Sequence, residues 1–187
     1  FKDKIIYVPV EDMPGGDNPY VRENFQRNCI SRGIKGAEDI DLVLISDLDE
    51  IPNPFLIKVF DKKKRYAVFE QKLYYYKFNL QSISQPYWYG TRICVKKFLK
   101  SPQWLRNLKF KKYPFWRIDK PKNIQIIENG GWHFAYLQSP KNISNKIRSF
   151  AHGEFNKEHL ADEIKIKERI SKGQDVFERG FKIKKIK

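Results

Sequence analysis

The chain has 187 residues, 37 lysines and arginines against 22 aspartates and glutamates, and a formal net charge of +15. This length fits a single domain over residues 1–187, which buries roughly 70% of the surface that the unfolded chain exposes and so needs no disulfide framework. The positive charge is scattered over every segment without a recognition motif, which argues against a specific nucleic-acid partner and favours a diphosphate, an anionic glycan or a peripheral anionic membrane surface.

The first part of the chain predicts a strand, a helix and a second strand. Residues 4–10 are rich in β-branched and aromatic side chains, which favour a strand. Asn18 and Pro19 supply an N-cap and a first-turn proline for a helix that ends at Gly33. Residues 41–46 form a short apolar run, which predicts a buried strand.

The middle of the chain is rich in predicted strands. Asn53 followed by Pro54 predicts the start of another short helix. Runs of β-branched and aromatic residues then predict three strands, at residues 66–79, 91–98 and 123–137, the last interrupted by Gly130 and Gly131.

The last part of the chain predicts two helices. Ser139 and Pro140 repeat the cap signal for a helix through Ala151, and residues 156–172 predict a second helix that Gly173 ends. This order of elements predicts an α/β fold.

The two cysteines and the hydropathy pattern exclude several classes of protein. Cys29 and Cys94 lie far apart in unlike contexts, so we expect core thiols and no disulfide framework or cysteine metal site. No apolar run approaches the ~20 residues that span a bilayer.

Three carboxylates stand within four residues after the strand predicted at 41–46: Asp47, Asp49 and Glu50. Open α/β sheets bind ligands at the carboxyl ends of their strands. With their side chains on one side of an extended backbone, Asp47 and Asp49 are suited to hold a divalent cation that keeps sites open for substrate phosphates. The alternative is that the acids solvate a strand end and cap the next helix.

Two other interpretations of these acids fit less well. A calcium loop of the EF-hand type needs Gly and Glu at its sixth and twelfth positions, where this chain has Pro52 and Lys58. A phosphatase of the haloacid-dehalogenase type needs further acids at a later strand end, and the later aspartates do not follow apolar strand runs.

Six stretches, in the same order over nearly the whole chain, resemble glycosyltransferase family 17 and its microbial or viral branch in particular. The family contains the β-1,4-N-acetylglucosaminyltransferase that adds the bisecting sugar to N-glycans. The stretches are ENFQRNCI (23–30), LVLISDLDEIP (42–52), FEQKLYYY (69–76), WYG (88–90), NGGWHF (129–134) and SFAHGEF (149–155).

The resemblance implies a GT-A type fold with a mixed central sheet, a UDP-sugar donor, and Mn²⁺ or Mg²⁺ between the Asp-x-Asp motif and the diphosphate. It also implies that the first strand of the nucleotide-binding half precedes residue 1. We expect Asp49 to bind the metal directly, and Asp47 to lie near the ribose or a metal-bound water. Glu50 would orient this donor-binding loop by accepting backbone N–H bonds, or serve only as a structural acid.

One histidine and one glutamate complete the expected site. His133 follows two glycines that permit close approach, and neutral imidazole is suited to be a further metal ligand; a packed or hydrogen-bonded structural role is the alternative. Transfer with inversion also needs a carboxylate that takes the proton of the acceptor hydroxyl. Glu154 is preferred over Glu70 and Glu128, because it follows the aromatic-rich segment and lies in a stretch that resembles the family; the alternative is an exposed glutamate at a helix end.

Other residues are candidates for binding the donor and the sugars. Trp88, Trp132 and Tyr89 belong to clusters of aromatic residues, which serve either sugar stacking or core packing. Arg27 and Arg92 are suited to bidentate contacts with the diphosphate, although surface salt bridges explain them equally well.

The sequence therefore predicts an inverting, metal-dependent glycosyltransferase that uses a UDP-sugar, UDP-GlcNAc by resemblance, and a glycan or glycolipid acceptor. The alternative is a non-catalytic module that holds a glycan or nucleic acid on a degenerate transferase fold. We expect a cytoplasmic, membrane-associated protein, or a Golgi-lumen protein if the source is eukaryotic.

Overall fold

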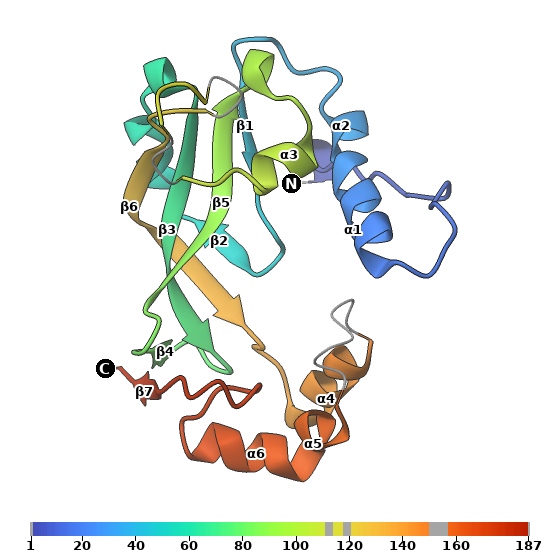
Figure 1. Cartoon of the computed structure of the whole chain (residues 1–187), viewed down its shortest axis with the longest axis vertical. Helices are drawn as coiled ribbons and strands as arrows, with labels where there is room; N and C mark the ends of the chain where they lie inside the picture. Colours follow the sequence, from blue (N-terminus) through green and yellow to red (C-terminus); the bar gives the residue numbers. More distant parts are fainter. Residues whose placement is uncertain (1, 111–113, 118–120, 150–156, 187) are drawn as a thin grey trace. The chain divides into compact units, whose positions relative to one another are not determined.

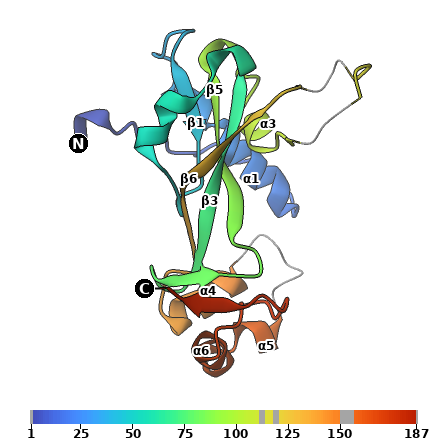
Figure 2. The ribbon, with the colours of Figure 1, turned by 90° about the vertical axis from the view of Figure 1, so that its left-hand side faces the viewer.

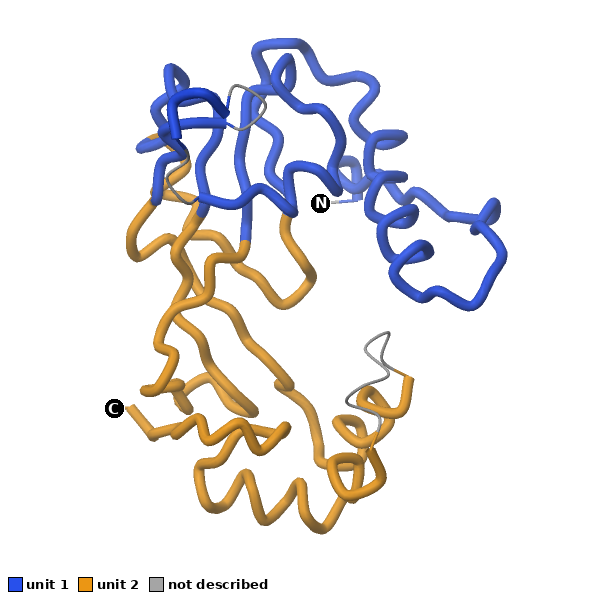
Figure 3. The backbone as a smooth tube through the Cα atoms, viewed as in Figure 1, with its two compact units in different colours: residues 1–45, 59–68, 91–126 blue, residues 46–58, 69–90, 127–187 orange. Residues whose placement is uncertain are grey.

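The computed structural model of the chain describes residues 2–110, 114–117, 121–149 and 157–186. The backbone forms two compact units, coloured separately in Figure 3. Unit 1 comprises residues 1–45, 59–68 and 91–126, and unit 2 comprises residues 46–58, 69–90 and 127–187. Each unit has a hydrophobic core of its own.

The strands form an antiparallel sheet in the order β1-β5-β3-β4-β7, with β6 paired to β3 and β2 paired to β6. The predicted mixed sheet is therefore wrong. Short connections such as residues 76–79 between β3 and β4 allow only antiparallel pairing, because parallel neighbours need a crossover of a dozen or more residues. The strands are β1 Leu42–Ile45, β2 Glu50–Pro52, β3 Tyr66–Tyr75, β4 Leu80–Ser82, β5 Tyr87–Val95, β6 Gln125–Ala135 and β7 Ile183–Lys185.

In unit 1 the helix at residues 102–106 contacts β1, and the helix at residues 19–28 packs against that helix. The side chain of Asn18 accepts the backbone N–H of Tyr20 at the start of the first helix, as its N-cap position predicts. Both cysteines are buried, which confirms that they are core thiols. The core contains Val43, Ile45, Tyr66, Cys94, Leu105 and Leu108. The α-helices of this unit are α1 Pro19–Asn28, α2 Ile30–Gly33 and α3 Pro102–Arg106.

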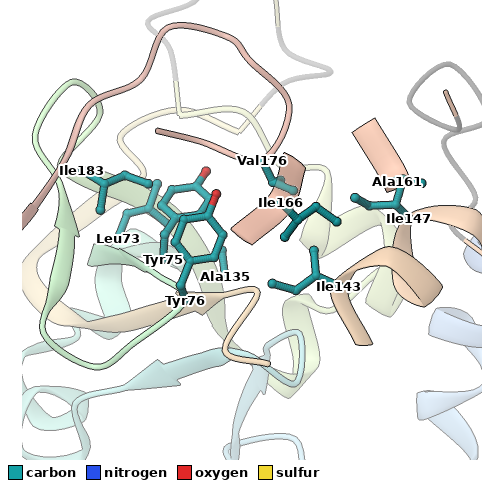
Figure 4. Packing of buried hydrophobic residues seen from close by; sticks show 10 residues of the cluster. All are labelled: Leu73, Tyr75, Tyr76, Ala135, Ile143, Ile147, Ala161, Ile166, Val176 and Ile183. Carbon is teal, nitrogen blue, oxygen red and sulfur yellow. The ribbon is translucent and has the colours of Figure 1, made fainter. Parts of the chain in front are cut away.

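Unit 2 packs three helices against one another, as Figures 1 and 2 both show beside β7. They are α4 Pro140–Arg148, α5 Glu158–Ala161 and α6 Glu163–Ser171. Figure 4 shows the core of this unit, in which Tyr75 at the end of β3 and Tyr76 directly after it share one cluster with Ile143 of α4 and Ile166 of α6. The ladder from Leu80↔Lys185 to Ser82↔Ile183 pairs β4 with β7.

Four short 3₁₀ helices complete the description: η1 Lys2–Lys4, η2 Pro54–Val59, η3 Lys62–Lys64 and η4 Lys96–Phe98. The second of these is the short helix that Asn53 and Pro54 predict, and the side chain of Asn53 accepts the N–H of Phe55.

Several element predictions are wrong. The helix predicted to end at Gly33 is two helices, α1 and α2, with Cys29 between them, and the strand predicted at 91–98 ends at Val95, where η4 follows. Residues 5–10 have no regular secondary structure, and Ile5, Ile6 and Tyr7 are 68%, 70% and 85% exposed. A β-rich run becomes a strand only where a neighbouring strand accepts its hydrogen bonds, and within the described residues none pairs with this segment. The helix predicted at 156–172 is two helices, because Asp162 accepts the N–H of Lys165 and starts a new one.

A further wrong prediction is the interruption of the strand at Gly130 and Gly131, since β6 runs through both. Gly131 has φ +136°, a conformation that L side chains rarely adopt, and this keeps β6 paired to β2.

Candidate active site

The Asp-x-Asp motif forms a tight turn instead of the extended backbone that the sequence predicts. The N–H of Glu50 donates to the carbonyl oxygen of Asp47 over 3.0 Å, so residues 47–50 close a hydrogen-bonded turn. Leu48 lies at the tip and is 99% exposed. Asp47 and Asp49 are therefore presented by a turn that follows β1 in the sequence.

Glu50 anchors this turn. Its side chain is 3% exposed, and its two oxygens accept the backbone N–H of Asp47 over 3.2 Å and the indole N–H of Trp88 over 2.7 Å. Gly90 lies beside the carboxylate, and a Cβ there would come within 2.6 Å of Glu50 Cδ. Glu50 thus accepts a backbone N–H of the loop, and such charge-assisted bonds orient a turn strongly.

The pairing of β2 with β6 brings the turn beside His133. Glu50 pairs with His133, and the N–H of Phe134 donates to the carbonyl oxygen of Asp49 over 2.9 Å. The N–H of Asn53 donates to the carbonyl oxygen of Gly130 over 2.8 Å. Gly131 thus admits the backbone of β2, whereas Gly130 lies against Phe69 of β3.

Asp49 and His133 form the central pair of the site. Asp49 Oδ1 lies 3.4 Å from His133 Nε2, and their side chains are 35% and 12% exposed. Burial alone would raise the pKa of the Asp49 carboxyl, but the hydrogen bond with His133 and attraction to His133 and Lys146 outweigh it and hold that pKa below its ordinary value. Asp49 is therefore held as a carboxylate.

Three more side chains complete the surroundings of this pair. The Trp88 ring lies against the His133 ring with 5.0 Å between centroids. Lys146 of α4 places its Nζ 5.0 Å from the centroid of Tyr136, and burial raises the pKa of the Tyr136 hydroxyl, which stays neutral. The site thus joins an acid, an imidazole, an ammonium and aromatic rings.

The pair fits the divalent cation that the resemblance implies. Two ligands of one ion at bond lengths of about 2.1 Å lie about 3 Å apart in octahedral geometry, close to the separation of Asp49 Oδ1 and His133 Nε2. Over the described ranges, no three His, Cys, Asp or Glu residues gather to hold a metal, so Asp47 does not complete a set of three. Ions of the magnesium type accept one or two protein ligands when substrate phosphates and water supply the rest.

The second ring nitrogen of His133 bears on its role. Nδ1 is buried and meets no hydrogen-bond partner in the described part of the chain. If Nε2 binds a metal, Nδ1 carries a proton without an acceptor, which costs about 1–3 kcal/mol. If Nε2–H donates to Asp49, the unpaired atom is an acceptor, which proteins tolerate more often. His133 therefore suits a hydrogen bond to Asp49 as well as it suits metal ligation. Asp49 is the better candidate for a direct metal ligand.

The sheet divides the predicted sugar contacts between two faces, because neighbouring strand residues point to opposite sides. Trp88 shares the face of His133. Tyr89 points to the other face, where its hydroxyl donates to Glu70 over 2.9 Å. Trp132, next to His133 on β6, also points to that other face and is 38% exposed. Of the three aromatic candidates, only Trp88 is brought to the central pair.

The predicted arginines lie in unit 1, where each has contacts of its own. Arg27 donates to Gln103 over 2.6 Å and to Glu23 over 2.9 Å, which links α1 to α3. Arg92 is 7% exposed, with its guanidinium 5.9 Å from the centroid of Phe110.

The predicted base Glu154 lies outside the described residues. Of the other two candidates, Glu70 bonds to Tyr89 as above, and Glu128 is exposed on β6.

Sequence reasoning missed Lys146 and Gln71. Lys146 is one of many lysines, and only the packing of α4 shows that its charge acts on Asp49. Gln71 is fully buried, lies beside Gly90, and donates to the carbonyl oxygen of Trp132 over 3.4 Å. A polar residue within an apolar strand run was a usable signal for Gln71, because buried amides need partners.

Comparison with known proteins gives one match. The family model described as glycosyltransferase family 17 matches residues 1–179 of the 187. No curated protein and no solved structure matches. Over the described residues, no helix is long and apolar enough to span a membrane.

Proposed function

The chain belongs to glycosyltransferase family 17, and on this premise we propose that it is an inverting, metal-dependent transferase of the GT-A type. The donor is UDP-GlcNAc and the acceptor is a glycan or glycolipid. The observation that carries the proposal is the Asp49–His133 pair, 3.4 Å apart beside the turn that Glu50 anchors.

Asp49 holds Mn²⁺ or Mg²⁺ in this proposal, with His133 as second ligand or as hydrogen-bond donor to Asp49. The bound ion would act as a Lewis acid on the diphosphate, whose negative charge grows as UDP leaves. The protein contributes an acid that is already ionised, since the pKa of Asp49 is held low. Glu50 and Trp88 fix the turn, so Asp49 needs little reorganisation when the donor binds.

The remaining roles follow the same chemistry. Glu154 takes the proton from the acceptor hydroxyl as that oxygen attacks the anomeric carbon. Asp47, on the first position of the turn, contacts the ribose or a metal-bound water. Lys146 keeps positive charge beside Asp49, which favours a diphosphate at the same place. Trp88 supports His133 with its ring and Glu50 with its indole N–H.

The experiment is a mass-spectrometric screen of UDP-sugars with Mn²⁺, which records both hydrolysis and transfer. We expect turnover of UDP-GlcNAc by the unmodified chain and none by Asp49→Asn. Asp17→Asn is the matched control, because Asp17 is exposed and lies in unit 1. Equal turnover by Asp49→Asn and Asp17→Asn would refute the assigned role of Asp49.

A thermal melt separates the enzyme from a non-catalytic binding module. A ligand at a hundred times its dissociation constant stabilises the fold by about 2.7 kcal/mol. We expect Mn²⁺ to stabilise the chain, and UDP to add stability only when Mn²⁺ is present. Equal stabilisation by UDP with and without Mn²⁺ would favour the binding module.

A further inference from the structure

A hollow of about 430 Å³ opens in unit 2, and neither Asp49 nor His133 lines it. Its size is at the lower end for ligand pockets, which suits a small molecule. Seven residues from three parts of the chain line it: Lys77, Asn79, Leu80, Lys167, Ile170, Ser171 and Lys185.

We call this hollow the lysine pocket. Its lining comes from β4, β7 and α6, which Figure 1 labels, and from Lys77 and Asn79 just before β4. Lys167, Ile170 and Ser171 share one face of α6, since positions three and four apart are neighbours on a helix. Lys185 of β7 pairs directly with Leu80 of β4. The pocket is therefore set by tertiary packing and is not a run of lysines in sequence.

The floor of the pocket is apolar and fixed. Leu80 and Ile170 both pack against the buried core of unit 2. Ile183, two residues before Lys185 and on the same face of β7, belongs to that core. Figure 4 shows Ile183 and Ile166 inside it. The lysines above this floor thus stand on a rigid base.

The pocket carries three ammonium groups and no acid in its lining. The structure describes no ion pair for Lys77, Lys167 or Lys185. Of the two acids on α6, Glu168 lies 3.9 Å from Lys172, which is not part of the pocket, and Glu163, one turn before Lys167, does not line the pocket. Ammonium groups bind phosphate as point charges, and convergence of several raises the local anion concentration.

We propose that the lysine pocket is a second binding site, separate from the transfer site, for a small phosphate ester. Lys77, Lys167 and Lys185 bind the phosphate, and the organic part packs on Leu80 and Ile170. Asn79 hydrogen-bonds its substituents, and the Ser171 hydroxyl, which donates to the carbonyl oxygen of Glu168 over 2.8 Å, accepts a hydrogen bond from them. This inference does not depend on the proposed transfer reaction.

The test measures binding of glucose 6-phosphate to the full chain by calorimetry, with glucose and inorganic phosphate as comparisons. The double variant Lys167→Gln with Lys185→Gln should weaken binding on the order of tenfold or more, the scale of lost hydrogen bonds to charged groups. The control is Lys62→Gln with Lys63→Gln, which removes equal charge from another basic hollow, in unit 1.

Glucose should not bind, and inorganic phosphate should bind more weakly than the ester because it does not use the apolar floor. An equal loss in both double variants would show general attraction to a basic protein and overturn the proposal. So would undetectable binding of glucose 6-phosphate.

A separate experiment measures binding of the chain and its variants to vesicles of phosphatidylcholine with phosphatidylglycerol. Binding to them that depends on Lys167 and Lys185, without binding of the soluble ester, would assign the lysines to a membrane surface and refute the pocket.

Discussion

Gly131→Ala tests how the fold holds the candidate site together. Gly131 has φ +136° and pairs with Pro52 across the β2–β6 ladder. A Cβ there would overlap the carbonyl oxygen of Ile51 and come within 2.9 Å of the backbone nitrogen of Asn53. These neighbours are backbone atoms, so the chain cannot relieve the overlap by turning a side chain.

The expected cost has two parts. A non-glycine residue in such a backbone conformation costs about 1–3 kcal/mol. Moving β2 away also weakens the hydrogen bonds from Asn53 to Gly130 and from Phe134 to Asp49, each worth about 1 kcal/mol. Together they lower the free energy of unfolding by about 3–5 kcal/mol. For a chain of this size the melting temperature should fall by roughly 10 °C.

Urea unfolding followed by circular dichroism measures this change, and the control is Gly36→Ala. A Cβ at Gly36 would meet nothing within 4 Å, so that variant should stay within about 0.5 kcal/mol of the original chain. The displaced ladder should also separate Asp49 from His133 and weaken Mn²⁺-dependent UDP binding. A Gly131→Ala loss below about 1 kcal/mol, or an equal loss in Gly36→Ala, would refute the reasoning.

Three further predictions concern single side chains. His133→Phe removes the hydrogen bond that lowers the pKa of Asp49, so that pKa should rise in a carbon-detected NMR titration; an unchanged midpoint would contradict the pairing. Because the folded-state pKa of Asp49 is depressed, its stabilisation of the fold is present above the unfolded value of about 3.9 and is lost as pH falls through the folded value. Burial raises the pKa of the Cys94 thiol to about 12, so about one thiol in ten thousand is ionised at pH 8, and iodoacetamide should label Cys94 only after unfolding in urea. Glu154→Gln should lower turnover roughly 10²-fold with UDP-sugar affinity unchanged, and finding this loss in Glu128→Gln instead would assign the base to Glu128.

Local signals in the sequence account for the helix starts. Asn18 and Ser139, each followed by proline, begin α1 and α4 where predicted, because a cap needs only its own side chain and the next N–H groups. The prediction of one helix over 156–172 is wrong because it overlooks Asp162, an N-cap signal that is equally local. The three strands β2, β4 and β7 have three residues each, too few for a periodic signal.

The order of motifs along the chain was enough to indicate the family, and the acids after β1 and the imidazole at 133 were enough to nominate Asp49 and His133. Only the tertiary structure decided how they meet. The β2–β6 register places Glu50 opposite His133, and strand alternation sends Tyr89 and Trp132 to the other face. The strand register, and the face of the sheet to which each side chain points, depend on contacts between residues some 80 positions apart. No local sequence pattern predicts such contacts. The sequence thus determined which groups are available for chemistry, and long-range packing determined which of them share one site.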